Sequence, residues 1–144
     1  MKKFVWLLTV AAFIAMGAVF HVEASDKTPD QFVKEAKAVI KEVSISDVKK
    51  MLDAKENFIL LDVRDKNELE EGRIPGAINI SRGMLEFKAP MVILDRDSKI
   101  VVYCGLDLRS PLATRTLNEM GYKNAVNMTG GLKAWKLAGY PITK

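Results

Sequence analysis

The chain has 144 residues, and its 22 lysines and arginines against 18 aspartates and glutamates give a formal net charge of +4. This balance is too mild to indicate nucleic-acid binding, and the charges are mixed along the chain in the way that is typical of a solvated surface. The length is that of one domain with a core of its own.

The first residues resemble a secretory signal. Lys2 and Lys3 precede an uncharged run over 4–20, and Val22 and Ala24 occupy the two small-residue positions before the expected cleavage point. This layout predicts a signal peptide over 1–24, cleaved after Ala24, and a periplasmic or secreted protein. An uncleaved membrane anchor is the alternative, because the run lies at the short edge of what spans a bilayer.

Histidine and cysteine usage narrows the chemistry. The only histidine, His21, lies in the predicted signal, so the mature protein has none. This excludes a Cys-His dyad, a Ser-His-Asp triad and a histidine metal site. The only cysteine, Cys104, excludes an internal disulfide and a CxxC redox pair. Alone, it would be read as a small buried apolar residue.

Strand-like and helix-like segments alternate after the signal. Thr28, Pro29 and Gln31 form a capping-box pattern that predicts a helix from 28 to about 43, within an N-terminal helical extension over 25–42. Apolar runs and helical spacing then predict strands at 43–45, 58–63, 77–80, 99–103 and 125–126, and helices at 48–54, 66–71, 110–120 and 130–138. Residues 83–90 stay unassigned. The alternation predicts an α/β domain over 43–144, with a central parallel sheet and helices on both faces.

Cys104 lies where such a domain places its functional crevice, just beyond the carboxyl end of a strand. Ser110 is the expected N-cap of the next helix and Pro111 its first residue, so the residues between form a short loop at a helix N-terminus. Inward-pointing N–H groups and the helix dipole hold anions at such a loop. Both favour the thiolate form of the cysteine, and Arg109 adds a planar fork of donors suited to oxyanions.

Four groups of residues, in order, resemble the rhodanese family of single-domain sulfurtransferases over about 43–142. They are the strand ending in Asp62-Val63-Arg64, then Glu68 with Gly72-Arg73-Ile74-Pro75-Gly76-Ala77, then Val101 to Cys104 with Arg109-Ser110, and Thr129-Gly130-Gly131 with Trp135, Gly139 and Pro141. The resemblance implies the rhodanese-like fold. Asp62 and Arg64 are interpreted as framework residues that fix the end of the sheet.

The resemblance also implies a reaction. Cys104 takes a sulfane sulfur from thiosulfate or a persulfide, becomes a persulfide itself, and passes the sulfur to a thiophilic acceptor, which could be a protein. The loop residues Gly105, Leu106, Asp107, Leu108 and Arg109 are then the substrate-binding residues. Neither a cofactor nor a metal is needed.

Two positions depart from the family pattern. Arg73 replaces a frequent histidine, and Asp107 stands where the loop often has glycine. Aspartate tolerates left-handed backbone better than most residues, so the turn can persist. Its carboxylate would oppose the thiolate and an anionic donor if it pointed at the loop amides. If it pointed to solvent or capped a backbone N–H, the effect would be small.

Two other functions remain open. The first is a rhodanese-like binding or redox-interaction module with little turnover, which Asp107 would favour. The second is a phosphatase, because phosphatases of related fold carry a cysteine and an arginine on such a loop. Those loops have five residues between the two, whereas Cys104 and Arg109 are separated by four. Phosphatase activity is therefore ranked low.

Overall fold

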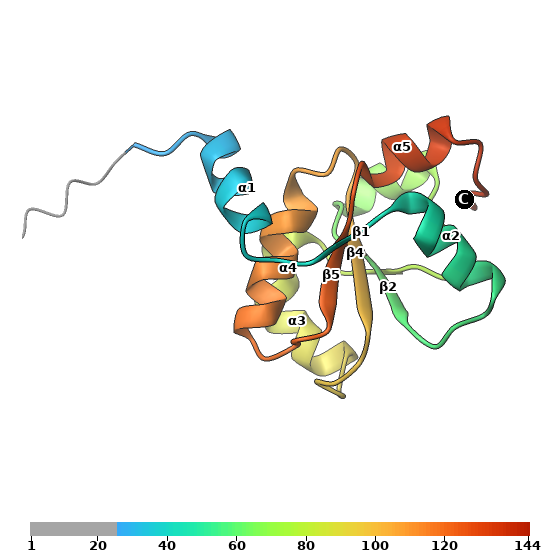
Figure 1. The fold of residues 1–144 in the computed structure, drawn as a ribbon. Coiled ribbons are helices and arrows are strands. Elements are labelled where there is room, and N and C mark those ends of the chain that lie inside the picture. The colour runs from blue at the N-terminus through green and yellow to red at the C-terminus, as the bar shows by residue number, and fades with distance from the viewer. Residues whose placement is uncertain (1–25) are drawn as a thin grey trace, which may run out of the picture.

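A computed structural model describes residues 26–144 of the protein (Figure 1). The predicted signal peptide over 1–24 and its cleavage after Ala24 lie outside these residues. Within them, no helix has both the length and the apolar character needed to cross a membrane.

Five parallel strands form one central sheet, in the order β1-β5-β4-β2-β3. The strands are β1 Glu42–Val43, β2 Ile59–Asp62, β3 Ile78–Asn79, β4 Ile100–Tyr103 and β5 Ala125–Met128. In this register Asp62 lies beside Tyr103, so β2 and β4 end at the same level. The predicted parallel sheet is confirmed, and Cys104 follows its central strand.

Helices cover both faces of the sheet, as predicted (Figure 1). One face carries α3 and α4, the other α2 and α5, and α1 packs beside α4. The helices are α1 Pro29–Lys37, α2 Ile45–Asp53, α3 Leu85–Val92, α4 Arg109–Glu119 and α5 Gly131–Leu137, with two 3-10 helices, η1 Lys66–Glu71 and η2 Arg82–Met84.

Side chains of β4 alternate between two apolar cores, because successive residues of a strand point to opposite faces. Ile100, Val102 and Cys104 belong to the core under α3 and α4. Val101 and Tyr103 belong to the core under α2 and α5. The fully buried strand agrees with the continuous apolar run that predicted it. The cysteine side chain therefore lies on the α4 side of the sheet.

Helix ends differ from the predictions in three places. The first helix, α1, ends at Lys37 rather than near 43, because Glu42 and Val43 pair with β5 as strand β1. Helix α2 begins at Ile45 rather than at 48, and its N-cap is Ser44, whose hydroxyl accepts a hydrogen bond from the Asp47 N–H at 3.1 Å.

The third difference lies at the cysteine loop. Helix α4 begins at Arg109 with Leu108 as its N-cap residue, so Ser110 is inside the first turn rather than capping it.

The unassigned segment 83–90 falls within η2 and α3, and a proline inside α3, Pro90, breaks the usual helical pattern.

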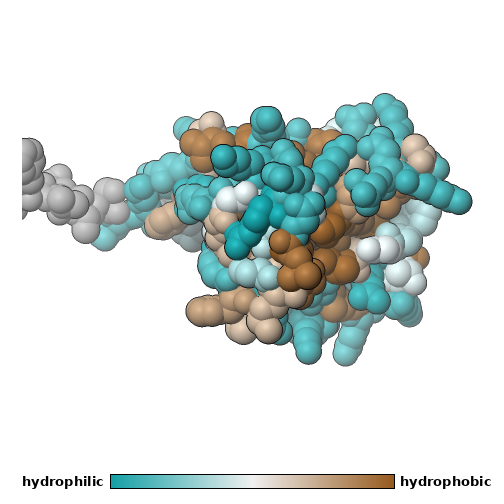
Figure 2. All heavy atoms as spheres, turned by 90° about the horizontal axis from the view of Figure 1, so that it is seen from below, coloured by the Kyte–Doolittle hydropathy of each residue, from teal (hydrophilic) through white to brown (hydrophobic). Residues whose placement is uncertain are grey.

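An apolar patch covers the end of the molecule opposite Cys104. Figure 2 views that end from below, and apolar side chains gather there. Helix α3 and the segment after it expose four large apolar side chains, namely Phe87, Met91, Val92 and Leu94. The patch takes no part in the site at the other end of the sheet.

Candidate active site

The thiol of Cys104 lies at the bottom of the loop that joins β4 to α4. Its residue is 1% exposed. The Ser110 hydroxyl donates to the sulfur at 3.4 Å, from the first turn of α4. Because Ser110 is not the N-cap, its hydroxyl is free to serve the sulfur, and a hydroxyl donor stabilises a thiolate or a persulfide anion.

Helix α5 holds the other side of the loop. The N–H groups of Leu132 and Lys133, in its first turn, donate to the carbonyl oxygens of Cys104 at 2.8 Å and Gly105 at 3.0 Å. The N–H groups of residues 105–108 donate to no residue in 26–144. The loop thus turns its carbonyls toward α5 and keeps unpaired N–H groups, which is the arrangement that binds an anion.

The close approach of α5 depends on Gly131. Its φ of +60° lies in the left-handed region, which favours glycine. A Cβ there would lie 2.7 Å from the Cys104 carbonyl oxygen and 2.9 Å from the Asp107 nitrogen. Only glycine lets α5 reach the loop carbonyls.

Asp107 turns its carboxylate toward protein donors, which decides between the two orientations left open by the sequence. Its φ is 60°, so aspartate does take the left-handed turn. One carboxylate oxygen, Oδ2, accepts from Lys37 Nζ at 2.6 Å and from the Gly130 N–H at 3.1 Å, while Oδ1 accepts from Asn127 Nδ2 at 2.8 Å. The carboxylate therefore caps a backbone N–H.

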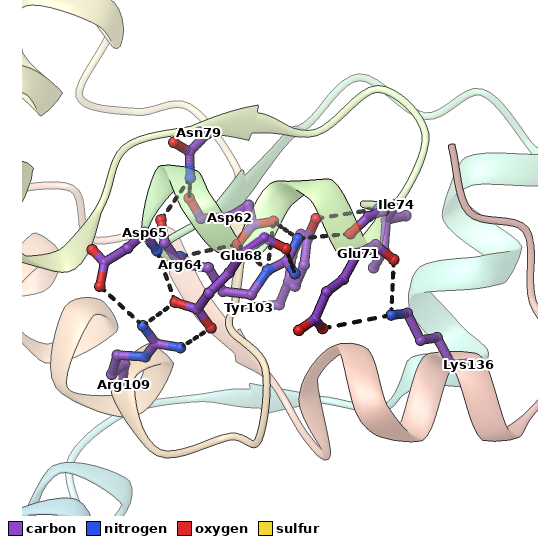
Figure 3. A network of polar contacts seen from close by, with 11 residues as sticks. Asp62, Arg64, Asp65, Glu68, Glu71, Ile74, Asn79, Tyr103, Arg109 and Lys136 are labelled. Atoms are coloured by element: carbon purple, nitrogen blue, oxygen red, sulfur yellow. Dashed lines mark hydrogen bonds and ion pairs between the residues drawn. The ribbon is translucent and has the colours of Figure 1, made fainter. Parts of the chain in front are cut away.

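Arg109 directs its guanidinium fork at Glu68 (Figure 3). Nη1 and Nη2 donate to the two oxygens of this carboxylate at 2.6 and 2.7 Å, and Nη1 lies 3.5 Å from Asp65. The hydrogen bond from Arg109 holds the pKa of Glu68 at about 2, and that of Arg109 is raised by the same bond. The fork predicted to bind a donor oxyanion is occupied by a protein carboxylate.

A buried ion pair lies next to this arrangement (Figure 3). Arg64 is 1% exposed and donates to both oxygens of Asp62, which is fully buried. The same guanidinium donates at 2.9 Å to the carbonyl oxygens of Glu68 and Gly72. Burial lowers the pKa of Arg64, but the hydrogen bond and charge of Asp62 outweigh it and raise the pKa overall. Asp62 and Arg64 thus form part of the framework beneath the site.

A cleft of about 450 Å³ opens beside the loop. Its walls combine both charges with apolar side chains, namely Arg64, Glu68, Glu71, Gly105, Leu106, Leu132, Lys133, Lys136 and Leu137. Of the predicted substrate-binding residues, Gly105 and Leu106 line this cleft. The side of the loop facing α1 carries Leu108 and Arg109, which line a separate apolar groove with Phe32. Asp107 faces its own polar cluster.

Sequence reasoning missed several residues of the site. The hydroxyl of Ser110 was expected at the helix cap, and Lys37 and Asn127 carried no signal because they reach the loop only through the tertiary fold. The lysines of the cleft, Lys133 and Lys136, follow the glycine pair of α5 at helical spacing. That spacing could have indicated that they flank the loop.

Comparisons with known proteins agree with this geometry. The rhodanese-like domain model matches residues 44–138. YtwF of Bacillus subtilis, named as a candidate sulfurtransferase, is 39% identical over 97 residues, 67% of this chain and 91% of its own length. A protein of Allochromatium vinosum named sulfurtransferase is 30% identical over 104 residues, 72% of this chain and 95% of its own.

Solved structures show the same fold. The polysulfide-sulfur transferase homodimer of Wolinella succinogenes has a TM-score of 0.67 and 36% identity, covering 77% of this chain and 83% of its own. RPA3614 of Rhodopseudomonas palustris, a protein of unknown function described as a candidate tyrosine phosphatase, has a TM-score of 0.76 and 33% identity, covering 82% and 96%. The cysteine loop, the fold and these matches together show that the chain belongs to the rhodanese-like domain family.

Proposed function

We propose that the protein is an exported sulfurtransferase that carries a sulfane sulfur on Cys104. The observation that carries this proposal is the loop itself: the only thiol of the chain stands at the start of a loop whose backbone N–H groups at 105–108 have no partner in 26–144, and Ser110 donates to it. Such donors stabilise a sulfur anion in a site shielded from water. Relatives named as sulfurtransferases support sulfur transfer as the reaction class.

The reaction needs no oxidant or reductant. The Cys104 thiolate attacks the outer sulfur of thiosulfate, a new S–S bond forms, and the electron pair of the broken S–S bond leaves with sulfite. A persulfide donor would release its parent thiolate in the same way. A nucleophilic acceptor then attacks the outer sulfur of the Cys104 persulfide and regenerates the thiolate. Each step conserves charge.

The chain's own residues divide the work. Ser110 and the N–H groups of Gly105 to Leu108 stabilise the anionic sulfur, while the cleft lined by Leu106, Lys133 and Lys136 receives the donor. Its volume of about 450 Å³ exceeds that of a small inorganic anion, so a small organic persulfide or a protein side chain also fits. Donor and acceptor are therefore proposed as thiosulfate or a persulfide, and a small or protein-borne thiophile.

The alternatives are less well supported. The binding-module hypothesis relied on the charge of Asp107, and that carboxylate contacts Lys37, Asn127 and Gly130. The phosphatase hypothesis requires a loop that encircles phosphate. The loop here has four residues between Cys104 and Arg109, and the arginine fork is held by Glu68.

Intact mass spectrometry tests the proposal. The purified protein is treated with thiosulfate or a small organic persulfide, and then with cyanide, beside Cys104→Ser. We expect a gain of one sulfur atom that cyanide removes, and no gain in the variant. If no donor loads the wild-type protein, sulfur carriage by Cys104 is wrong. Export is tested separately by expressing residues 1–144 in a bacterium, where a mature N-terminus at Ser25 supports it and retained residues 1–24 contradict the predicted cleavage.

A further inference from the structure

Helix α1 contributes a charged side chain to the rear of the active-site loop. Lys37, the last residue of α1, places its Nζ 2.6 Å from Asp107 Oδ2 and 3.1 Å from Glu42 Oε1. The bond to Asp107 joins residues 70 positions apart. Lys37 also precedes the segment 44–138 that matches the family model, so one partner of this contact lies outside the part that the family model covers.

The polar cluster around Asp107 contains two carboxylates, those of Asp107 and Glu42. The Asn127 amide donates at 2.8 Å to both Glu42 Oε1 and Asp107 Oδ1. Its own oxygen is buried and finds no partner among the residues described by the structure. The Asp107 side chain is 12% exposed. Within this cluster, Lys37 supplies the positive charge that faces the two negative ones.

The position of Asp107 makes this charge important for the loop. Asp107 lies in the loop between Cys104 and Arg109, whose N–H groups at 105–108 have no partner within 26–144, so its carboxylate and an anionic sulfur on Cys104 would share a short loop. Two negative charges at such separations disfavour each other where solvent is excluded. A lysine within hydrogen-bond distance of Asp107 opposes that repulsion and holds the carboxylate on the α1 side of the loop.

We propose that Lys37 is a positioning residue of the active site: through Asp107 it keeps the loop able to carry an anionic sulfur on Cys104. The inference rests on the proposed sulfur transfer and adds α1 to the site. Burial lowers the pKa of Lys37, but its hydrogen bonds to Asp107 and Glu42 outweigh this and raise the pKa overall. Lys37 therefore stays positively charged over the pH range of the assay.

A double-mutant cycle on the full chain tests the proposal, with the rate of sulfur loading followed by rapid mixing and intact mass. We expect Lys37→Met to load about tenfold more slowly, equivalent to about 1.4 kcal/mol in the barrier. Lys37→Arg keeps the charge and should load at nearly the wild-type rate. Asp107→Asn removes the loop carboxylate while asparagine accepts the left-handed turn, so its own loading rate is the reference for the second half of the cycle.

The double variant separates positioning from support of the fold. With Asp107→Asn in place there is no loop carboxylate to offset, so adding Lys37→Met should change the loading rate by less than about twofold. Lys34→Met is the matched control, because Lys34 is exposed on α1 and forms no ion pair within 26–144. We expect it to load like wild type.

Each outcome either supports or overturns the proposal. Equal loading by Lys37→Met and wild type overturns it, and so does an equal slowing by Lys37→Met in both backgrounds. If Lys37→Met fails to fold, a folded double variant supports action through Asp107, whereas two unfolded variants show a structural role and overturn it. Failure of the wild type itself to take sulfur from any donor refutes the proposed function instead.

Discussion

The active-site loop is held by two ionic contacts that differ in origin. We call the pair of Arg109 with Glu68 the front contact, and the pair of Asp107 with Lys37 the rear contact; each has a shortest N–O distance of 2.6 Å. Both partners of the front contact lie within 44–138, and Glu68 lines the cleft. The rear contact brings in α1 and does not reach the cleft.

The difference separates two tasks. Under the proposed function, the front contact determines which charges a donor meets, because it occupies the arginine fork beside the cleft. The rear contact then determines the charge and shape of the loop that is proposed to carry the sulfur. Changes at the front should therefore alter donor preference, and changes at the rear should alter sulfur loading whatever the donor.

The largest effect is expected where the front contact is anchored. In Arg64→Met, the Asp62 carboxylate stays buried without its partner, and the carbonyl oxygens of Glu68 and Gly72 lose their donor. Removing one partner of a buried ion pair typically costs about 3–5 kcal/mol. We expect a loss of that size in the free energy of unfolding, measured with urea.

Arg73→Met is the matched control for this change. Arg73 is half-buried, and its side chain forms no hydrogen bond or ion pair with any residue from 26 onward. We expect its free energy of unfolding to change by less than about 0.5 kcal/mol. Similar losses in both variants would show that Arg64 does not anchor the front of the site.

Where α5 meets the loop, Gly131→Ala should have the next largest effect. Its Cβ would lie 2.7 Å from the Cys104 carbonyl oxygen, in a left-handed residue. Strain and overpacking together should lower the free energy of unfolding by about 2–4 kcal/mol. Gly139→Ala also has a positive φ, +71°, but its Cβ meets nothing within 4 Å. It should lose only about 1–2 kcal/mol and load sulfur normally. Equal loading by both variants would contradict the role given to the approach of α5.

The sheet and the place of Cys104 could be predicted because they depend on local patterns. Continuous apolar runs over 58–63 and 99–103 read as strands buried on both faces, and a residue at the end of such a strand falls at the crevice. The front contact could be predicted in part. The sequence indicated that Arg109 carries its fork to the site, but not that Glu68, which comes from η1, would occupy it.

The rear contact could not be predicted, since nothing local ties Lys37 to a residue 70 positions away. Predicting it required the end of α1, which was placed too late because the helical spacing of apolar residues continues to Ile40. The role of Ser110 was hidden by a preference for serine at helix caps. In each case a tertiary contact overrode a correct local tendency.

At the front, Glu68→Gln should shift donor preference with little loss of stability. The change removes the negative charge that occupies Arg109 and faces the cleft. Without this charge, we expect the KM for thiosulfate to fall by about three- to tenfold. A tenfold fall corresponds to about 1.4 kcal/mol in binding free energy. Glu71→Gln is the control, since Glu71 also lines the cleft but lies 3.9 Å from Lys136 and leaves Arg109 paired. An unchanged KM in Glu68→Gln, or an equal fall in both variants, would contradict the front role.

The smallest effect concerns the pH dependence of stability, and it isolates the front contact. Folding lowers the pKa of Glu68 from 4.5 to about 2, chiefly through the hydrogen bond from Arg109. The lowered pKa means that its stabilisation is present above pH 4.5 and is lost as the pH falls towards 2. The pair is partly exposed, so its contribution at pH 7 should be below about 1 kcal/mol. The difference in free energy of unfolding between wild type and Glu68→Gln should therefore shrink as the pH falls from 4.5 to 2. A difference that stays constant over this range would show that the front contact contributes nothing through the charge of Glu68.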